Sequence, residues 1–345
     1  MYDIITFGSA TRDINLKSTG FKTVKDDKDS VTGEGICLAL GSKIDIDDIK
    51  YTSGGGGTNT AATFAKQGFK TAFCGAIGVD SAGLEVVKEL KGMRIDLRFL
   101  QKRKEKSTNQ SVIISAGNED SSTGSGQDRT ILVYRGASEL MDGKTIPWNK
   151  LKTKWFYVAP LSGLLCDTFE ELVDFAKKNN IKVAVNPSKQ QLSLPIEQLK
   201  IIFSKVDILF LNQEEASFLT KISFKEEVEI FKKLDEMCGG VAVMTKGGDG
   251  VVVSDGKYIY SAKPNPSREI VDTTGAGDSF ASGFLSDFIR YDGDIEKAVQ
   301  LGLGNSEANL KEIGAKTGLL EKNAEFVRVP VTKQLCTDNN LCITK

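Results

Sequence analysis

The sequence has no histidine among its 345 residues. This absence excludes a Ser-His-Asp triad, a Cys-His pair, histidine-ligated zinc or iron, and an imidazole proton shuttle. Proton transfer near neutral pH must therefore be carried out by a carboxylate, a lysine, a tyrosine or a cysteine.

The sequence also lacks long apolar runs, an excess of one charge and paired cysteine motifs. No apolar run approaches the roughly 20 residues of a membrane-spanning helix, and the N-terminus resembles a first core strand, not a signal peptide. A net charge of −1, with acidic and basic residues scattered, argues against a nucleic-acid or membrane partner. The six cysteines form no CxxC motif, so we expect reduced thiols in a cytoplasmic protein.

Two common nucleotide-binding motifs are missing as well. The chain has no GxxxxGK followed by Ser or Thr, which excludes a P-loop enzyme. It also has no GxGxxG opening a helix, which leaves a dinucleotide-binding Rossmann site unsupported. Any phosphate site must therefore use a different arrangement of small residues.

From about Thr71 onward, strand-like and helix-like segments alternate along the chain. Apolar, β-branched runs at 71–77, 155–159, 181–185, 206–211 and 242–245 alternate with helical patterns that include 81–90, 168–178 and 225–237. This alternation predicts an α/β fold, a mostly parallel sheet sandwiched between helices. Ligands in such folds bind beyond the carboxyl ends of the strands.

Two segments break the alternation, at 14–52 and 107–137. The second contains strand-like runs at 111–115 and 130–134, joined by a polar loop at 117–128. We expect these segments to form a small β-sheet flap inserted in a single domain spanning 1–345, the alternative being surface hairpins. The tail at 326–345 is expected to be an extension with a strand at 327–331.

The segment from Asp272 to Asp278, DTTGAGD, is the most informative motif. Gly275, Ala276 and Gly277 have almost no side chain, and they precede a helix whose N-terminus favours anions, phosphate above all. Asp278 suits such a site if it is the base that deprotonates a hydroxyl attacking a phosphoryl group. A tight turn with a helix-capping aspartate is the alternative interpretation.

The helix that follows supports this location. Phe280, Phe284 and Phe288 recur every fourth residue, beside a second apolar stripe. This spacing is typical of a helix buried across a broad face. A helix packed in that way holds its N-terminus rigidly, as a catalytic anion site requires.

A run of four glycines, 54–57, opens another helix and is followed by Asn59. Four glycines are costly to order, which indicates that another group approaches the backbone closely. The run is either a hinge or a turn that contacts substrate, and Asn59 is either a cap or a partner for substrate hydroxyls.

Three polar groups follow strands. Asn212 and Glu215 have the spacing of a capping box, and the same groups can hold water around magnesium. Asp13 comes just after the first strand, where a solvated turn is the ordinary interpretation. The segment from Thr245 to Gly250 is another glycine-rich turn after a strand, for which a simple hairpin connection is the plain interpretation.

In this order, the motifs resemble those of the ribokinase-like (PfkB) family of carbohydrate and nucleoside kinases, from Asp3 to about Gly318. The resemblance implies a ribokinase-like three-layer sandwich whose small sheet acts as a lid. In some relatives the lid also forms a homodimer interface. The implied site residues fall into five groups: Asp278 as catalytic base with the amides of Gly275, Ala276 and Gly277; Asp13, Gly55, Gly56 and Asn59 for the acceptor; Asn212, Thr245, Gly247, Gly250 and Asn305 for the nucleotide; Asn212 and Glu215 for Mg²⁺ through water; and Asp272 and Thr274 for a monovalent cation such as K⁺.

The resemblance implies ATP-dependent phosphorylation of a primary hydroxyl of a small sugar. Two departures bear on the acceptor: Thr11 stands where ribokinases usually carry Asn, and Gly56 where they carry Lys. A nucleoside kinase acting on a 5′-hydroxyl is the alternative, with Phe21, Ile36 or Leu38 as candidates to contact the base. A sensor that binds sugar or nucleotide without catalysis is the remote alternative.

Overall fold

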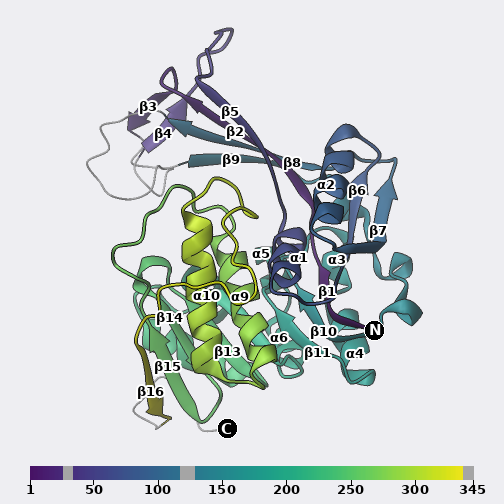
Figure 1. The fold of residues 1–345 in the computed structure, drawn as a ribbon, viewed down its shortest axis with the longest axis vertical. Helices are drawn as coiled ribbons and strands as arrows, with labels where there is room; N and C mark the ends of the chain where they lie inside the picture. Colours follow the sequence, from purple (N-terminus) through teal and green to yellow (C-terminus); the bar gives the residue numbers. More distant parts are fainter. Residues whose placement is uncertain (26–33, 117–128, 337–345) are drawn as a thin grey trace.

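The computed structural model describes residues 1–25, 34–116 and 129–336 (Figure 1). Within these residues the chain forms one large sheet and a smaller, separate one. The large sheet has the spatial order β16 (Val331–Leu335), β15 (Tyr258–Ala262), β14 (Val251–Ser254), β13 (Val241–Thr245), β12 (Ile208–Asn212), β11 (Lys182–Val185), β10 (Thr153–Val158), β1 (Tyr2–Phe7), β6 (Thr71–Gly78) and β7 (Asp96–Arg103). The strands from β13 to β7 in this order run parallel, and only β14, β15 and β16 pair antiparallel. The expected mostly parallel sheet is confirmed.

Helices cover both faces of the large sheet. One face carries α3 (Leu164–Asp167), α4 (Phe169–Lys178), α5 (Lys189–Leu192), α6 (Ile196–Phe203), α7 (Gln213–Thr220) and α8 (Glu227–Met237). The other carries α1 (Gly56–Lys66), α2 (Ser81–Gly92), α9 (Ala276–Arg290) and α10 (Ile295–Leu310). Short 3₁₀ turns occupy 137–140, 143–145, 148–150 and 247–249. None of the helices in the described part of the chain is long and apolar enough to cross a membrane.

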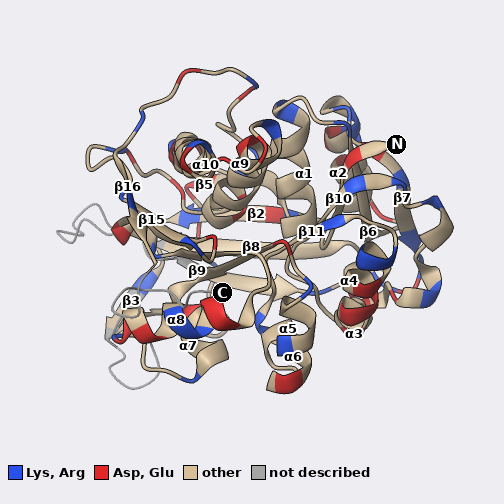
Figure 2. Ribbon diagram, turned by 90° about the horizontal axis from the view of Figure 1, so that it is seen from below, with Lys and Arg blue, Asp and Glu red and all other residues tan. Residues whose placement is uncertain are grey.

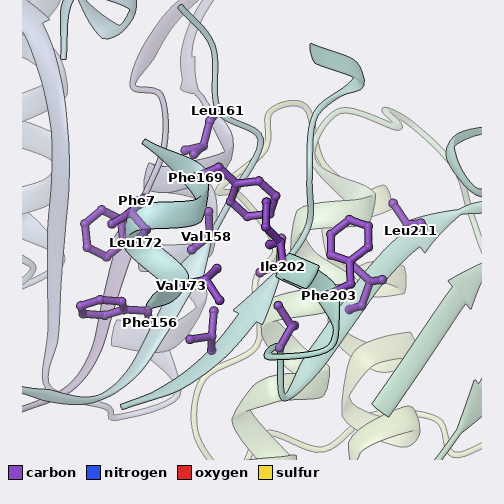
Figure 3. Packing of buried hydrophobic residues seen from close by; sticks show 14 of the residues in the cluster. Phe7, Phe156, Val158, Leu161, Phe169, Leu172, Val173, Ile202, Phe203 and Leu211 are labelled. Carbon is purple, nitrogen blue, oxygen red and sulfur yellow. The ribbon is translucent and has the colours of Figure 1, made fainter. Parts of the chain in front are cut away.

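Strand side chains alternate between the two helical layers. In β10, Phe156 and Val158 pack against the α4 side, while Trp155 and Tyr157 pack against the α9 side. Figure 3 shows the first of these layers, where Phe169 of α4 meets the sheet residues. Because both faces are buried, the strands are uninterrupted apolar runs, which is why they were predictable from the sequence.

Charged residues lie on the outer surfaces of the helices and in the loops. Figure 2 shows acidic and basic residues interspersed along the ribbon of the helices and loops. The distribution agrees with the nearly neutral composition.

The two segments that break the alternation supply the small sheet. Its order is β5 (Asp48–Gly54), β2 (Thr11–Ser18), β8 (Asn109–Ala116) and β9 (Arg129–Tyr134), and a hairpin of β3 (Lys22–Lys25) and β4 (Glu34–Cys37) lies beside it (Figure 1). The prediction that these segments form a sheet separate from the main one is therefore confirmed for these strands. The polar loop expected at 117–128 lies outside the described residues.

The two faces of the small sheet differ in chemistry. The strand register places Asp13, Asn15 and Lys17 on one face, and a cavity of about 100 Å³ separates Asn15 and Lys17 from loop residues 270–273 of the main body. The inner face, turned toward the main body, therefore carries these polar side chains together with Ile113 and Ile131. The opposite, outer face carries apolar side chains at Ile14, Ile49, Tyr51, Val112, Leu132 and Tyr134.

The tail differs from two expectations. The strand begins at Val331 instead of spanning 327–331, because the side-chain amide of Gln300 bonds both the carbonyl oxygen of Val329, at 2.5 Å, and its N–H, at 3.1 Å. These backbone groups are thus unavailable for strand pairing. The expectation of reduced thiols is correct for Cys37, Cys74, Cys166 and Cys238 but wrong for Cys336, which is disulfide-bonded.

Candidate active site

The N-terminus of α9 lies at the centre of the site. Gly275 precedes the helix with φ 81°, and a β-carbon on it would come within 2.5 Å of that of Ala315. Only glycine fits both constraints. No side chain caps the helix, so its N-terminal amides and its positive dipole end are available to a ligand.

Asp278 stands in the first turn of this helix, half-buried. The side-chain Nδ2 of Asn59, on α1, donates a 2.8 Å hydrogen bond to its Oδ2. Burial raises the pKa of Asp278, while the bond from Asn59 and the positive charge of Lys316 act in the opposite direction. Asp278 does not cap its own helix, so the capping alternative is not what the structure shows.

The glycine run is close-packed against a different neighbour at each position. A β-carbon on Gly54 would clash with the Asp13 carboxylate, and one on Gly55 would meet the Ser9 carbonyl oxygen at 2.5 Å. At Gly56 it would come within 2.9 Å of Pro160 and 3.4 Å of Oδ1 of Asp278. The run therefore lets α1 begin directly beside both carboxylates, which explains its glycines without a hinge.

Asp13 reaches the site from β2 of the small sheet. It is 4 % exposed and hydrogen-bonded to Ser111 of the neighbouring strand β8, so it is not a solvated turn residue. Burial raises its pKa, and the charges of Lys316 and Arg12 oppose that shift. Asp13 and Asp278 thus lie beside two glycines of one run, Gly54 and Gly56.

A cavity of about 230 Å³ joins the α9 N-terminus to the strand ends. It is lined by Gly275 to Asp278 and by Asn212, Glu215 and Asn186. Asn212 and Glu215 form a complete capping box, because each side chain bonds the other's backbone N–H, at 2.8 and 2.9 Å. The structural interpretation of this pair is therefore correct, and the pair also lines the cavity.

The electrostatics of this cavity are acidic. Burial and the charge of Asp278 both raise the pKa of Glu215. Such a concentration of carboxylates beside an anion site favours a cation between them and a phosphate. The described residues contain no cluster of three acidic, histidine or cysteine ligands, so any metal here must keep several waters.

A second cavity, of about 240 Å³, extends from the same helix end in the other direction. Thr245, Gly247 and Gly250 line it together with Ala276, Gly277 and apolar residues that include Phe280 and Leu303. The glycine turn connects β13 to β14 as an antiparallel hairpin, so the simple interpretation also holds. The cavity is lined by the helix N-terminus at one end and by apolar side chains at the other, a combination that suits a nucleotide.

Asn305 is not brought into this cavity. It is fully buried, its Nδ2 donates to the carbonyl oxygen of Ser279 at 2.8 Å, and its Oδ1 accepts from the N–H of Leu320 at 2.9 Å. Its neighbours Ser306 and Glu307 line the cavity instead. Asn305 therefore joins α9, α10 and the following loop.

Asp272 holds the anion-site loop together. Its Oδ1 accepts from the N–H and the hydroxyl of Thr274, at 2.9 and 2.7 Å, and its Oδ2 accepts from the N–H of Gly314 at 2.9 Å. The loop after α10 is thus fixed against the loop before α9. Asp272 and Thr274 thus lie in the loop directly before the N-terminus of α9.

Two site residues were not identified from the sequence. Lys316 is 5 % exposed, donates to Oγ of Ser53 at 2.5 Å and lies 4.0 Å from Oε2 of Glu89. Burial lowers its pKa, and the charges of Glu89, Asp13 and Asp278 oppose that shift. Asn186 could have been identified, because it directly follows a predicted strand, whereas Lys316 lies in a loop without a local signal.

A family model described as pfkB family carbohydrate kinase matches residues 1–323. A cytidine kinase from Thermococcus kodakarensis is 32 % identical over 185 residues, 53 % of this chain and 64 % of that relative, so the match spans less than two thirds of its length. A ribokinase from Haemophilus influenzae is 27 % identical over 278 residues, 77 % of this chain and 83 % of that one.

The fold is also similar to that of solved structures. The structure of Arabidopsis thaliana ribokinase complexed with ribose and ATP superposes with a TM-score of 0.73 at 20 % identity, covering 93 % of this chain and 96 % of that one. At this identity the likeness establishes the ribokinase-like fold.

Proposed function

The chain belongs to the pfkB family of carbohydrate kinases, and from that membership we propose that it transfers the γ-phosphoryl group of ATP to a primary hydroxyl of a small sugar. One observation carries the proposal. The carboxylate of Asp278, held by Asn59, lines a cavity at the uncapped N-terminus of α9, and Ala276 and Gly277 of the same helix end also line the second cavity. This is where a base, an acceptor hydroxyl and a transferring phosphoryl group have to meet.

The chemistry follows from this placement. Asp278 takes the proton of the acceptor hydroxyl as its oxygen attacks the γ-phosphorus and ADP leaves. The amides of Gly275, Ala276 and Gly277 stabilise the negative charge on the transferring group. Holding the hydroxyl in line with the phosphate can supply ~7–11 kcal/mol of the barrier reduction.

The acceptor is held by Asp13, Gly55, Gly56 and Asn59. Asp13 is an acceptor of hydroxyl hydrogen bonds, and the glycines let a sugar approach the backbone closely. In the described chain, Oδ1 of Asn59 is buried without a hydrogen-bond partner. A substrate hydroxyl donating to this oxygen would remove the cost of leaving it unsatisfied.

The phosphate donor, ATP, lies along the cavity of about 240 Å³ and is flanked by Thr245, Gly247 and Gly250. Asn212 and Glu215 suit Mg²⁺ held through water, because they offer oxygen ligands beside the anion site. When bound, the ion would neutralise charge on the β- and γ-phosphates. Asp272 and the carbonyl of Thr274 would hold a monovalent cation such as K⁺ behind the anion site. A donor of this kind favours a cytoplasmic enzyme, where ATP is available.

A nucleoside is the second candidate acceptor, favoured by the identity to the cytidine kinase. The base would occupy the space between the small sheet and the main body, where Ile113, Ile270 and Ile313 supply an apolar wall. Of the candidates considered from sequence, Phe21 is buried and Leu38 is 49 % exposed, and neither lines this space.

The small sheet would act as a lid and as a homodimer interface. Its inner face carries Asp13 and is turned toward the main body, so closure would exclude water from the acceptor. Its outer face exposes Ile49, Tyr51 and Leu132 by 49, 57 and 54 %. An apolar face of this kind is typical of a surface covered by a partner, and a second copy of the same sheet is complementary to it.

The test is phosphoryl transfer from Mg-ATP to a panel of ribose, fructose, adenosine, cytidine and inosine. We expect turnover with one acceptor class, and we expect Asp278→Asn to fold and bind ATP but to lose most of the transfer. Near-normal turnover of Asp278→Asn would refute the role of this base. An absence of ATP consumption across a broad panel of alcohols would favour the non-catalytic sensor.

A further inference from the structure

Two charged side chains in the nucleotide cavity have no part in the function proposed above. Glu307 lies on α10 and Arg268 lies in the loop after β15, and both line the cavity. Both are fixed to Asn265: Nη1 of Arg268 donates to its carbonyl oxygen at 3.1 Å, and its N–H donates to Oε1 of Glu307 at 2.7 Å. Opposite charges therefore stand on either side of one backbone residue.

Neither charge is matched by an ion pair within residues 1–25, 34–116 and 129–336. Glu307 is only 8 % exposed, and its Oε2 makes no hydrogen bond to these residues. This oxygen is not among the fully buried atoms, so a ligand that enters the cavity can donate N–H groups to it, and the guanidinium can donate to acceptor atoms of the same ligand. The cavity therefore calls for a ligand edge that offers both.

The remaining walls indicate where that edge would lie. Leu303, Phe280 and Leu310 line the same cavity and offer apolar contacts to the faces of a planar ring. Arg268 also covers the glycine turn, since its Nη2 is 3.2 Å from where a β-carbon on Gly248 would stand. A base in this slot, with its phosphates toward Ala276 and Gly277, would direct its polar edge toward Glu307 and Arg268.

The geometry points to guanine: we infer that the cavity binds guanine nucleotides at least as tightly as adenine nucleotides, with Glu307 as the residue that reads the base. The inference rests on the proposed function, because it assigns a base to the donor of that site. Oε2 of Glu307 accepts from N1–H and the N2 amino group of guanine, and Arg268 donates to O6.

Adenine fits these groups less well. It offers the carboxylate a single amino group, and the lone pair of its N1 is repelled by the carboxylate oxygen. Arginine with guanine O6 and N7 is a common bidentate base contact. Discrimination by contacts of this quality is on the order of 5- to 150-fold.

The experiment measures binding to the full chain without an acceptor, by calorimetry with Mg-GDP, Mg-IDP and Mg-ADP. We expect GDP to bind at least as tightly as ADP. IDP should bind with an affinity between those of GDP and ADP, because hypoxanthine keeps N1–H and O6 but has no N2 amino group. ADP binding tighter than GDP would overturn the inference.

Glu307→Gln provides the sharper test. The carbonyl oxygen of the new glutamine keeps the hydrogen bond from Asn265, while its amide group now donates toward N1 of the base. The affinity for GDP should therefore fall at least fivefold, and the affinity for ADP should stay the same or increase. Glu312→Gln, at an exposed carboxylate just after α10, should leave the GDP-to-ADP ratio unchanged. An unchanged ratio in Glu307→Gln would also overturn the inference. If ADP binds and the enzyme turns over but GDP does not bind, the guanine inference fails and the kinase function stands. If the nucleotides bind in the expected order but no acceptor is phosphorylated, the proposed function fails and the guanine inference stands.

Discussion

Asn59 on α1 donates a 2.8 Å hydrogen bond to the carboxylate of Asp278 on α9, two residues 219 positions apart in the chain. Both helices pack on the same face of the large sheet. The bond therefore places the end of the glycine run and the anion site in one fixed arrangement.

Replacing Asn59 should lower the catalytic efficiency measured with the acceptor substrate varied. Asn59→Ala removes a charge-assisted hydrogen bond to Asp278, and such bonds contribute about 1.5–3 kcal/mol. We expect kcat/KM for the acceptor to fall on the order of 10- to 150-fold, with the KM for ATP unchanged. Steady-state kinetics with each substrate varied in turn provide the measurement. An equal rise in both KM values would contradict a role at the acceptor end.

Lys316 should set the acid limb of the pH profile. Its positive charge lowers the pKa of Asp278, which burial raises, so Lys316→Met should raise that pKa further. Asp278 then becomes protonated at higher pH, and kcat/KM should be lost from the acid side while recovering as the pH increases. The measurement is kcat/KM across pH for the wild type and the variant.

A matched control for that experiment is Lys311→Met, because Lys311 is exposed in the same loop. It should leave the acid limb in place. A uniform fall of activity at every pH in Lys316→Met would indicate a structural role in place of an electrostatic one.

Gly275→Ala should damage the anion site. The added β-carbon meets Ala315 at 2.5 Å, and φ 81° is unfavourable for alanine. Displacing the helix amides should reduce kcat on the order of 10²- to 10³-fold. Gly92→Ala, where a β-carbon would contact nothing within 4 Å, serves as the control and should retain full activity.

The outer face of the small sheet predicts an oligomeric state. We expect a homodimer by light scattering coupled to size exclusion, and a monomer for the double variant Ile49→Lys with Leu132→Lys. Ile131→Lys adds the same charge one residue away, on the inner face, and should leave the dimer intact. A wild-type monomer at micromolar concentration would rule out this interface.

The aromatic stripe of α9 should dominate the stability of its layer. Phe284 is fully buried and contacts Phe210, Phe280 and Phe288, with ring centroids 5.4, 6.1 and 6.1 Å away. Phe284→Ala should lower the free energy of unfolding by about 3–5 kcal/mol in chemical denaturation. Phe224→Ala, at a residue 52 % exposed, should lower it far less.

Local sequence patterns predicted the large sheet well, because strands buried on both faces carry continuous apolar runs. Asn212 and Thr245 stand at the ends of two of these apolar runs, and they are paired in the register of β12 and β13. The prediction of a strand at 327–331 was wrong because the side chain of Gln300 occupies the backbone groups of Val329. Strand propensity carries no information about such a contact.

The rest of the site depends on long-range packing. Lys316 is placed in the site by its contacts with Ser53 and Glu89, and Glu307 by its contact with Asn265. These partners are far away in the chain, so the local sequence around Lys316 or Glu307 does not reveal the contacts. Asn305 shows the converse. Its position near a nucleotide was expected by resemblance, yet its amide is fully engaged in joining two helices and a loop.

Each glycine of the 54–57 run touches a different part of the molecule, from the Asp13 carboxylate to the ring of Phe73. No position in the run can therefore gain even a methyl group without displacing something that the reaction or the core requires. In this chain, changes that alter the contacts to the acceptor without moving the start of α1 are therefore confined to inner-face side chains of the small sheet, outside the glycine run.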